Sequence, residues 1–148
     1  MLKLASKEEN SKRISIESEI EENLMVDGDE KQLSQLTWNL IKNSKEAVGN
    51  EGKICVKLVK DEQKVVLEVE DNGQGIPLDL RERIFEPFYT TKIKGSGLGL
   101  AIVQRIVKNH HGQIKVNSPS SLDHEGTQIS VFLPIYSTGL QEESAIEA

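Results

Sequence analysis

Two asparagines lie four residues apart in a run with helical periodicity, and their side chains could ligate a metal ion. The stretch EKQLSQLTWNLIKNSKEAV predicts a helix on which Asn39 and Asn43 share one face, with Glu46 three residues further along. Mg²⁺ prefers oxygen ligands and often shares them with substrate phosphates, which suits two amides that lack a carboxylate. Taken alone, the pair is better explained as two solvated asparagines.

A second candidate is the stretch DNGQGIP, which follows a predicted strand. Asp71 ends that strand, and Gly73 and Gly75 permit positive φ angles and a close approach of the backbone. A partly buried strand-end carboxylate is a suitable acceptor for an exocyclic amine such as that of adenine. The alternative is an ordinary Asn-Gly turn, which is favoured when this stretch is considered by itself.

A third candidate is GSGLGLAI, in which Gly95, Gly97 and Gly99 lead into a predicted helix. Amides at a helix N-terminus attract anions, and glycine lets a phosphate come close. The stretch lacks the Gly-Lys-Ser or Gly-Lys-Thr ending of a Walker loop, and it follows a loop rather than a strand. Lys92 precedes the glycines and could reach a terminal phosphate, whereas Lys94 is interpreted as a solvated loop residue.

The elements that would position these residues alternate between strands and helices. Alternating patterns predict strands at 13–20, 53–60, 64–71, 113–118 and 126–134. Helical patterns predict helices at 30–48 and 98–112, with a short helix at 78–85. Gly112 is the predicted C-cap of the later helix, and Trp38 is expected in the core. This order favours an α+β two-layer sandwich, a mixed β-sheet covered on one face by helices.

Composition excludes several classes of function. The 148 residues include 18 Lys and Arg against 24 Asp and Glu, a net charge of −6 that argues against non-specific binding to nucleic acid or membranes. Cys55 is the only cysteine, so no internal disulfide forms, and its alternating context favours a buried small hydrophobe. With no membrane-spanning run and no signal-peptide profile, we expect a cytoplasmic domain.

The order of the motifs resembles a known family. NLIKNSKEA, DNGQGIP, IFEPFYTTK and GSGLGLAI are similar to the N, G1, F and G2 boxes of sensor histidine kinases, and GTQISVFLP is similar to the closing strand of their catalytic domain. The resemblance runs from about Arg13 to Pro134. It implies the ATP-binding fold shared with gyrase, Hsp90 and MutL, the Bergerat-type fold. The lid is short, as in kinases resembling the nitrogen-regulation type.

The resemblance also implies the roles of individual residues. Asn39 and Asn43 would hold Mg²⁺ against the triphosphate of ATP. Asp71 would bind the adenine amine, with Thr127 helping through a water and Ile76 touching the base. Gly73 and Gly75 would open the floor of the pocket, and residues 77–95 would form a lid over it. The remaining implied ATP-binding residues are Glu46, Phe88, Thr91, Lys92, Gly95, Ser96, Gly97, Leu98, Gly99 and Leu100.

The implied activity is transfer of the ATP γ-phosphoryl group, with Asn39, Asn43 and Lys92 as catalytic residues. In gyrase-like relatives a glutamate at the position of Asn39 activates water, and an amide cannot serve as that base. The acceptor would be a histidine on a separate dimerisation domain, since no helical His-Glu or His-Asp stretch precedes Arg13. A response regulator would then receive the phosphoryl group. Many members carry Lys or Arg where this chain has Glu46.

The expected organisation is a linker remnant at 1–12, the catalytic ATP-binding domain at 13–134 and a flexible tail at 135–148. The parent protein would be a homodimer, itself anchored in a membrane or not, while this domain would contact neither membrane nor nucleic acid. Two alternatives stay open. One is a degenerate module that senses nucleotide without transfer, which the Glu46 departure favours. The other is an ATPase clamp, which Asn39 disfavours.

Overall fold

The elements of the computed structural model follow the predicted order of strands and helices. The structure describes residues 13–87, 99–118 and 126–136. Its elements are β1 (Arg13–Ile20), α2 (Glu30–Val48), β2 (Glu51–Asp61), β3 (Lys64–Asp71), two short 3-10 helices η1 (Leu78–Leu80) and η2 (Arg83–Phe85), α3 (Gly99–Asn109), β4 (Gln113–Asn117) and β5 (Thr127–Pro134). The stretch predicted as one short helix is therefore divided between η1 and η2.

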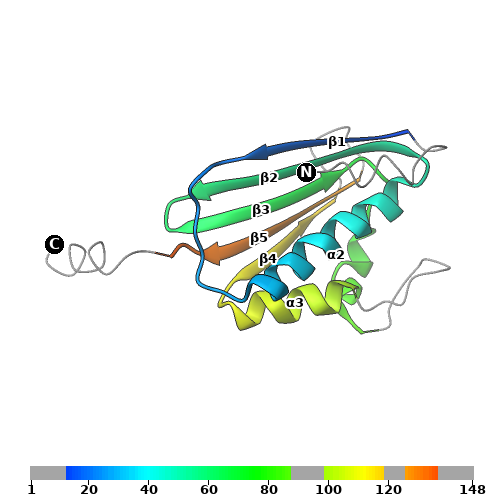
Figure 1. Ribbon diagram of the computed structural model, residues 1–148. Coiled ribbons are helices and arrows are strands. Elements are labelled where there is room, and N and C mark those ends of the chain that lie inside the picture. The colour runs from blue at the N-terminus through cyan, green and yellow to red at the C-terminus, as the bar shows by residue number, and fades with distance from the viewer. Residues whose placement is uncertain (1–12, 88–98, 119–125, 137–148) are drawn as a thin grey trace, which may run out of the picture.

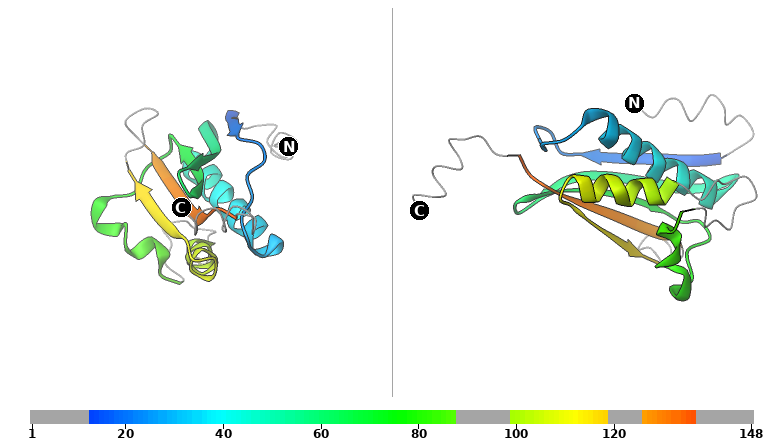
Figure 2. Two further views of the ribbon diagram at one scale, coloured as in Figure 1. Left: turned by 90° about the vertical axis from the view of Figure 1, so that its left-hand side faces the viewer. Right: turned by 90° about the horizontal axis from the view of Figure 1, so that it is seen from below.

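A five-stranded mixed sheet forms one layer, with the strand order β1-β2-β3-β5-β4. β1 and β2 are parallel, and the other neighbouring pairs are antiparallel. A parallel pair needs a crossover connection, and α2 supplies it between β1 and β2. Both α2 and α3 lie on the same face of the sheet (Figures 1 and 2). The predicted α+β two-layer sandwich with a mixed sheet is confirmed.

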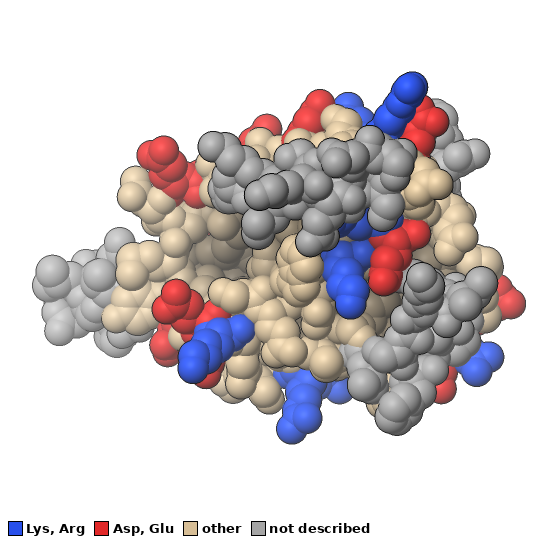
Figure 3. All heavy atoms as spheres, turned by 45° about the vertical axis from the view of Figure 1, so that its right-hand side comes forward, with Lys and Arg blue, Asp and Glu red and all other residues tan. Residues whose placement is uncertain are grey.

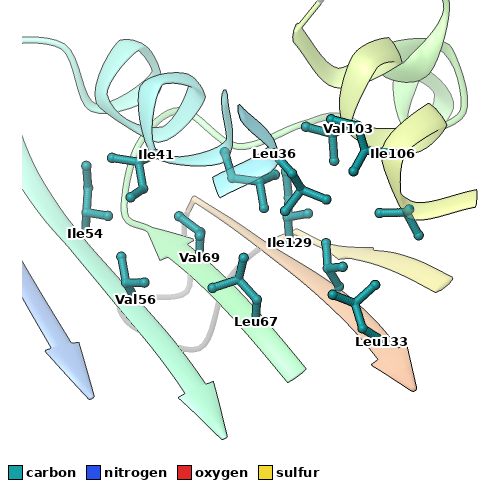
Figure 4. Packing of buried hydrophobic residues seen from close by; sticks show 13 residues of the cluster. Leu36, Ile41, Ile54, Val56, Leu67, Val69, Val103, Ile106, Ile129 and Leu133 are labelled. Carbon is teal, nitrogen blue, oxygen red and sulfur yellow. The ribbon is translucent and has the colours of Figure 1, made fainter. Parts of the chain in front are cut away.

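The core fills the space between the sheet and the two helices (Figure 4). Alternate residues of the central strands point towards the helices, because successive side chains of a strand face opposite sides. The helices contribute residues three or four positions apart. The buried apolar residues of this cluster are Leu36, Leu40, Ile41, Ile54, Val56, Leu67, Val69, Val103, Ile106, Val107, Ile129, Val131 and Leu133.

The opposite face of the sheet carries polar contacts between neighbouring strands. Gln128 on β5 donates to Glu68 on β3 at 3.1 Å and accepts from Asn117 on β4 at 3.0 Å. The ammonium groups of Lys64 and Lys115 lie 5.9 and 5.3 Å from the centre of the Phe132 ring. These contacts suit a face that has no helix layer over it.

The helix α2 begins at an aspartate and buries one stripe of its surface. The Asp29 carboxylate accepts a hydrogen bond from the Gln32 amide at 3.1 Å, so Asp29 is the N-cap of this helix. The expectation that Trp38 lies in the core is wrong, because its side chain is 52% exposed. Trp38 is two positions from both Leu36 and Leu40, or about 200° around the helix, so it faces away from the sheet.

The end of α3 differs from the prediction in the residue that terminates it. His111 takes the left-handed conformation, with φ 59°, whereas Gly112 does not. The amides of His111 and Gly112 donate to the carbonyls of Lys108 and Val107 at 3.1 and 2.9 Å, the pattern of a Schellman motif. Gly112 is needed for space instead, since an added Cβ would lie 2.5 Å from the Phe132 carbonyl oxygen.

His110 joins the end of α3 to the start of α2. Its Nε2 accepts a hydrogen bond from the Asp29 amide at 3.0 Å, while Nδ1 lies 2.8 Å from the Ile106 carbonyl oxygen. The two contacts fit a ring with its proton on Nδ1, because Nε2 must be free to accept. This histidine therefore connects the end of α3 to the start of α2 through its ring nitrogens.

Candidate functional site at the end of β3

The predicted base-binding carboxylate lies at the end of the central strand β3. Asp71 is 2% exposed, and its Oδ1 accepts a hydrogen bond from the Gly73 amide at 2.9 Å. Its register partner on β5 is Thr127, which is 4% exposed. A buried carboxylate is retained only where polar partners compensate its lost hydration. The structure therefore brings Asp71, Gly73 and Thr127 together at one end of the sheet.

The turn after β3 packs against the last turns of α2. At Gly73, an added Cβ would lie 2.5 Å from the Ala47 carbonyl oxygen, so only glycine allows this approach. Asn72 fixes the same turn to β2, since its Oδ1 accepts from the Lys53 amide at 2.8 Å. The predicted turn is thereby placed beside the end of α2 that carries Asn43.

Gly75 and Ile76 continue this turn towards the end of β4. Gly75 has φ 76°, a conformation that favours glycine. The Ile76 amide donates to the Ser118 hydroxyl at 3.0 Å, and that hydroxyl donates to the Gly126 carbonyl at 2.6 Å. Sequence reasoning did not select Ser118 or Gly126. Gly126 has no room for a side chain, since an added Cβ there would lie 1.9 Å from the Asp71 carbonyl oxygen.

The predicted metal ligands lie on the central and later turns of α2. Asn39 and Asn43 are both half-buried, while Glu46 is exposed. The Nδ2 atom of Asn39 is buried and has no hydrogen-bond partner, so this amide is not satisfied within the described part of the chain. Such a group is costly unless something binds it, by about 1–3 kcal/mol. The described residues contain no group of three or more His, Cys, Asp or Glu that could hold a metal.

Two of the predicted phosphate-binding residues begin α3. Gly99 is its exposed first residue, and an added Cβ there would meet nothing within 4 Å. Leu100 is half-buried and packs against the core, which fixes this helix end to the sheet. Phe88, Thr91, Lys92, Gly95, Ser96, Gly97 and Leu98 lie outside the described residues. Of the predicted lid, residues 77–87 are described and contain η1 and η2.

A separate cavity lies at the other end of the sheet and does not include the predicted site. Its volume is about 270 Å³, and its lining residues come from the segment before α2, the end of α3 and the end of β5. They are Val26, Asp27, His110, His111, Leu133, Pro134, Ile135 and Tyr136. Ile135 and Tyr136 are held there by hydrogen bonds from their amides to the Gln63 and Met25 carbonyls, at 2.9 and 2.7 Å.

Charged side chains of both signs are interspersed on the face drawn in Figure 3. The Lys and Arg residues coloured there do not gather into one large area. None of the helices in the described ranges is both long and apolar enough to cross a membrane.

Comparison with known proteins identifies the family to which the chain is similar. Residues 28–137 match the family described as histidine kinase-, DNA gyrase B-, and HSP90-like ATPase. Sporulation kinase C of Bacillus subtilis is 41% identical over 113 residues, which cover 76% of this chain and 26% of that protein. The signal transduction histidine-protein kinase AtoS of Escherichia coli is 39% identical over 132 residues, covering 87% of this chain and 21% of AtoS. The chain thus spans about a quarter of these curated relatives.

Solved structures of histidine kinases have the same fold. The mycobacterial sensor histidine kinase MprB superposes with a TM-score of 0.80 at 28% identity, covering 93% of this chain and 92% of that chain. Full-length ShkA in complex with AMPPNP gives 0.78 at 28% identity, covering 92% and 28%. ThkA in complex with the response regulator TrrA gives 0.73 at 30% identity, covering 90% and 37%.

The fold, the buried aspartate at the end of β3 and these matches agree on one class. The chain belongs to the family of histidine kinase-, DNA gyrase B- and HSP90-like ATPases. Within that family, the resemblance of its motifs to the ATP-binding domain of sensor histidine kinases is confirmed by the relatives and structures that it matches.

Proposed function

We propose that this chain is the ATP-binding catalytic domain of a sensor histidine kinase. ATP would bind where β3 ends and β5 begins, beside the C-terminal half of α2. The observation that carries this proposal is Asp71, a carboxylate that is 2% exposed at the end of β3 and oriented by the Gly73 amide. The relatives are kinases, and the AMPPNP complex of ShkA adds a nucleotide analogue to that comparison.

The adenine ring would be recognised by Asp71, whose carboxylate would accept a hydrogen bond from the exocyclic amine. Thr127 is buried directly across from it and would help through a water. Ile76 would touch the base from the turn that Gly73 and Gly75 allow to pack closely. Guanine carries a carbonyl oxygen where adenine has this amine, so the carboxylate would reject it.

The phosphates would be bound at the other side of the site. Amides at the start of α3, including those of Gly99 and Leu100, suit negative charge because a helix N-terminus has unpaired N–H groups. Lys92 and the stretch Gly95–Leu98 would complete this part, with Phe88 and Thr91 in the lid. Glu46 adds no positive charge where many relatives carry one, so Lys92 would have to supply it.

Asn39 and Asn43 fit Mg²⁺ as the ion that accompanies the triphosphate. Their side chains lie one turn apart on α2, and their amide oxygens are hard ligands of the kind that Mg²⁺ prefers. The buried Nδ2 of Asn39, which has no partner among the described residues, is a hydrogen-bond donor and would suit a phosphate oxygen beside the ion. When bound, the ion would neutralise charge on the phosphates. The two amides would hold it and orient the phosphates, and neither can remove a proton from water.

The reaction would be transfer of the γ-phosphoryl group to a histidine of a separate dimerisation domain. The bond from the γ-phosphorus to its bridging oxygen would break as a bond to an imidazole nitrogen forms, and ADP would leave. This domain would contribute positioning and electrostatics. A response regulator would then take the phosphoryl group onto an aspartate, as the ThkA complex with TrrA suggests. The parent protein would be a homodimer with this domain in the cytoplasm.

The test combines this chain with the dimerisation domain of its parent protein and ATP labelled in the γ-phosphate. We expect label on the acceptor histidine, with little release of free phosphate when the domain is incubated alone. Tight nucleotide binding without labelled histidine would instead indicate a nucleotide-sensing module. Rapid hydrolysis by the isolated chain would indicate an ATPase clamp.

A further inference from the structure

Ser118 lies directly after β4 and contacts three separate segments around the site. Its hydroxyl accepts from the Ile76 amide at 3.0 Å and donates to the Gly126 carbonyl at 2.6 Å. Its own carbonyl accepts a hydrogen bond from Nη2 of Arg81. A hydroxyl is suited to this place because it donates and accepts at once, which neither a methyl group nor an ammonium group can do.

The partners of Ser118 all border the proposed adenine site. Ile76 belongs to the turn after β3, and Gly126 precedes β5. The Gly126 backbone is pressed against Asp71, since a Cβ on it would lie 1.9 Å from the Asp71 carbonyl oxygen. Ser118 is therefore connected to the backbone of the proposed base-binding residue Asp71 through a single intervening residue, Gly126.

The turn after β3 and the start of β5 each contain a glycine, and the contact with Ser118 restricts the backbone at both. Gly75 and Gly126 have φ angles of 76° and 85°, which glycine adopts without strain but which leave the backbone free to take other conformations as well. An added Cβ on Gly75 would lie 3.0 Å from the Ser118 Oγ, so the hydroxyl is packed directly against the turn. The hydroxyl thus fixes both of these flexible positions at once, through its hydrogen bonds to the Ile76 amide and the Gly126 carbonyl.

Arg81 extends the connection to the first part of the predicted lid. It lies between η1 and η2 and reaches the Ser118 carbonyl across 37 positions of sequence. The Nε atom of the same guanidinium is buried and has no hydrogen-bond partner in the described part of the chain. The described part of the predicted lid, residues 77–87, is therefore joined to the end of β4 by the hydrogen bond from Arg81 to the Ser118 carbonyl.

We infer that Ser118 is a positioning residue for nucleotide recognition. Its hydroxyl holds Ile76 and the Asp71–Gly126 contact in one arrangement, and so sets both the affinity for adenine nucleotides and the preference for adenine over guanine. This inference rests on the proposed function and adds to it a residue outside the four motifs that the sequence resemblance supplied.

The experiment measures ADP and GDP affinity by calorimetry for the full chain and for Ser118→Ala. We expect the variant to bind ADP roughly tenfold more weakly, since it loses two hydrogen bonds that orient the site. The ratio of ADP to GDP affinity should fall as well, which a loss of stability alone would not cause. Ser130→Ala is the matched control, because Ser130 is a buried serine on β5, 5% exposed, whose register partner on β3 is Glu68 rather than Asp71.

A second variant guards against failure of the first to fold. Ser118→Cys fills nearly the same space with a group that forms only weak hydrogen bonds, so its ADP affinity should fall in the same direction. ADP affinity and ADP-to-GDP ratio within twofold of the unmodified chain, in either folded variant, would overturn the inference. If the unmodified chain bound no ADP, the proposed function itself would fail instead.

Discussion

Asn39 shows how a single side chain can indicate a ligand. Its Nδ2 atom is buried without a partner, although the same helix face carries Asn43 one turn away. An unpaired N–H donor suits an acceptor such as a phosphate oxygen, whereas the Asn39 oxygen is the atom that could bind a cation. The described residues contain no group of three or more His, Cys, Asp or Glu, so the proposed metal site depends on amide oxygens and would suit a cation whose charge is balanced by phosphates.

The proposed role of Asn39 predicts a selective effect of its removal. Asn39→Ala should abolish most of the increase in ADP affinity that Mg²⁺ provides, because one of two oxygen ligands is lost, and should leave affinity in EDTA nearly unchanged. Calorimetry in both buffers measures this. Gln35→Ala is the control, since it removes an exposed amide from the same helix. Equal weakening with and without Mg²⁺ would contradict a ligand role.

Cys55 gives a residue-scale prediction about pH. Burial raises the pKa of its thiol, and the Glu17 carboxylate, 3.9 Å from Sγ, raises it further. Because the thiolate is the reactive form, iodoacetamide should alkylate Cys55 more slowly at pH 8 than it alkylates a cysteine in an unstructured peptide. The rate should rise with pH towards the raised pKa, and Glu17→Gln should increase it at pH 8. A rate equal to that of the peptide would refute this environment.

At the scale of elements, the end of α3 depends on the backbone conformation of one residue. His111 occupies the left-handed position of the Schellman motif, where a side chain is strained and glycine is not. The sequence suggested Gly112 instead, since glycine is the commonest residue there. Glycine at 112 has a different cause, the close approach of the Phe132 carbonyl from another strand, which local sequence does not reveal.

This assignment predicts opposite effects of two substitutions at position 111. His111→Gly should raise the free energy of unfolding by up to about 1 kcal/mol, because the strain of the left-handed conformation is removed. His111→Val should lower it by about 1 kcal/mol or more, because a β-branched residue fits that conformation poorly. Urea denaturation followed by circular dichroism measures both. A decrease with glycine as large as that with valine would rule out the assignment.

The elements themselves were predictable because their patterns are local. The limits of α2 and β3 agree with the prediction, since Asp29 caps the helix and the alternation of β3 stops at the glycine-rich turn. The prediction that Trp38 lies in the core followed from its hydrophobicity alone. Its place on the helix, opposite to Leu36 and Leu40, instead predicts exposure. The parallel pairing of β1 with β2 depends on contacts about 38 residues apart, which no local pattern encodes.

The candidate site was predictable only in part, because some of its residues form a local sequence pattern and others come together only through long-range contacts. Asp71, Gly73 and Gly75 form a recognisable stretch, so the sequence alone selected them. Ser118 was missed because its hydroxyl partners are 42 and 8 positions away and its own sequence context is that of an ordinary loop serine. A hydroxyl at a strand end becomes informative only when the fold brings two other segments to it.

At the scale of the whole molecule, one core connects both helices to the sheet. Leu40 from α2, Val103 from α3 and Val131 from β5 are each at most 1% exposed within the same cluster. The layers therefore share their apolar contacts, and neither helix has a separate core to retain if the other unfolds.

Unfolding should consequently be a single transition. Circular dichroism and the fluorescence of Trp38, the only tryptophan, should give the same midpoint in urea. Leu40→Ala should lower the free energy of unfolding by about 2–5 kcal/mol, because it leaves a cavity between the layers. Lys42→Ala, on the exposed side of the same helix, should change it by less than about 0.5 kcal/mol. Two separate midpoints would contradict a shared core.

The central claim concerns the whole chain, because it places an adenine nucleotide between the end of β3, α2 and the start of α3. Calorimetric titration with ADP and Mg²⁺ tests it most directly, on the unmodified chain and on Asp71→Asn. We predict saturable binding by the unmodified chain and a loss of roughly 10- to 100-fold in affinity for the variant, because an amide group faces the adenine amine less favourably than a carboxylate. Glu68→Gln, on the opposite face of the same strand, should bind as the unmodified chain does. No heat of binding from the unmodified chain, or equal affinity in the Asp71→Asn variant, would contradict this account.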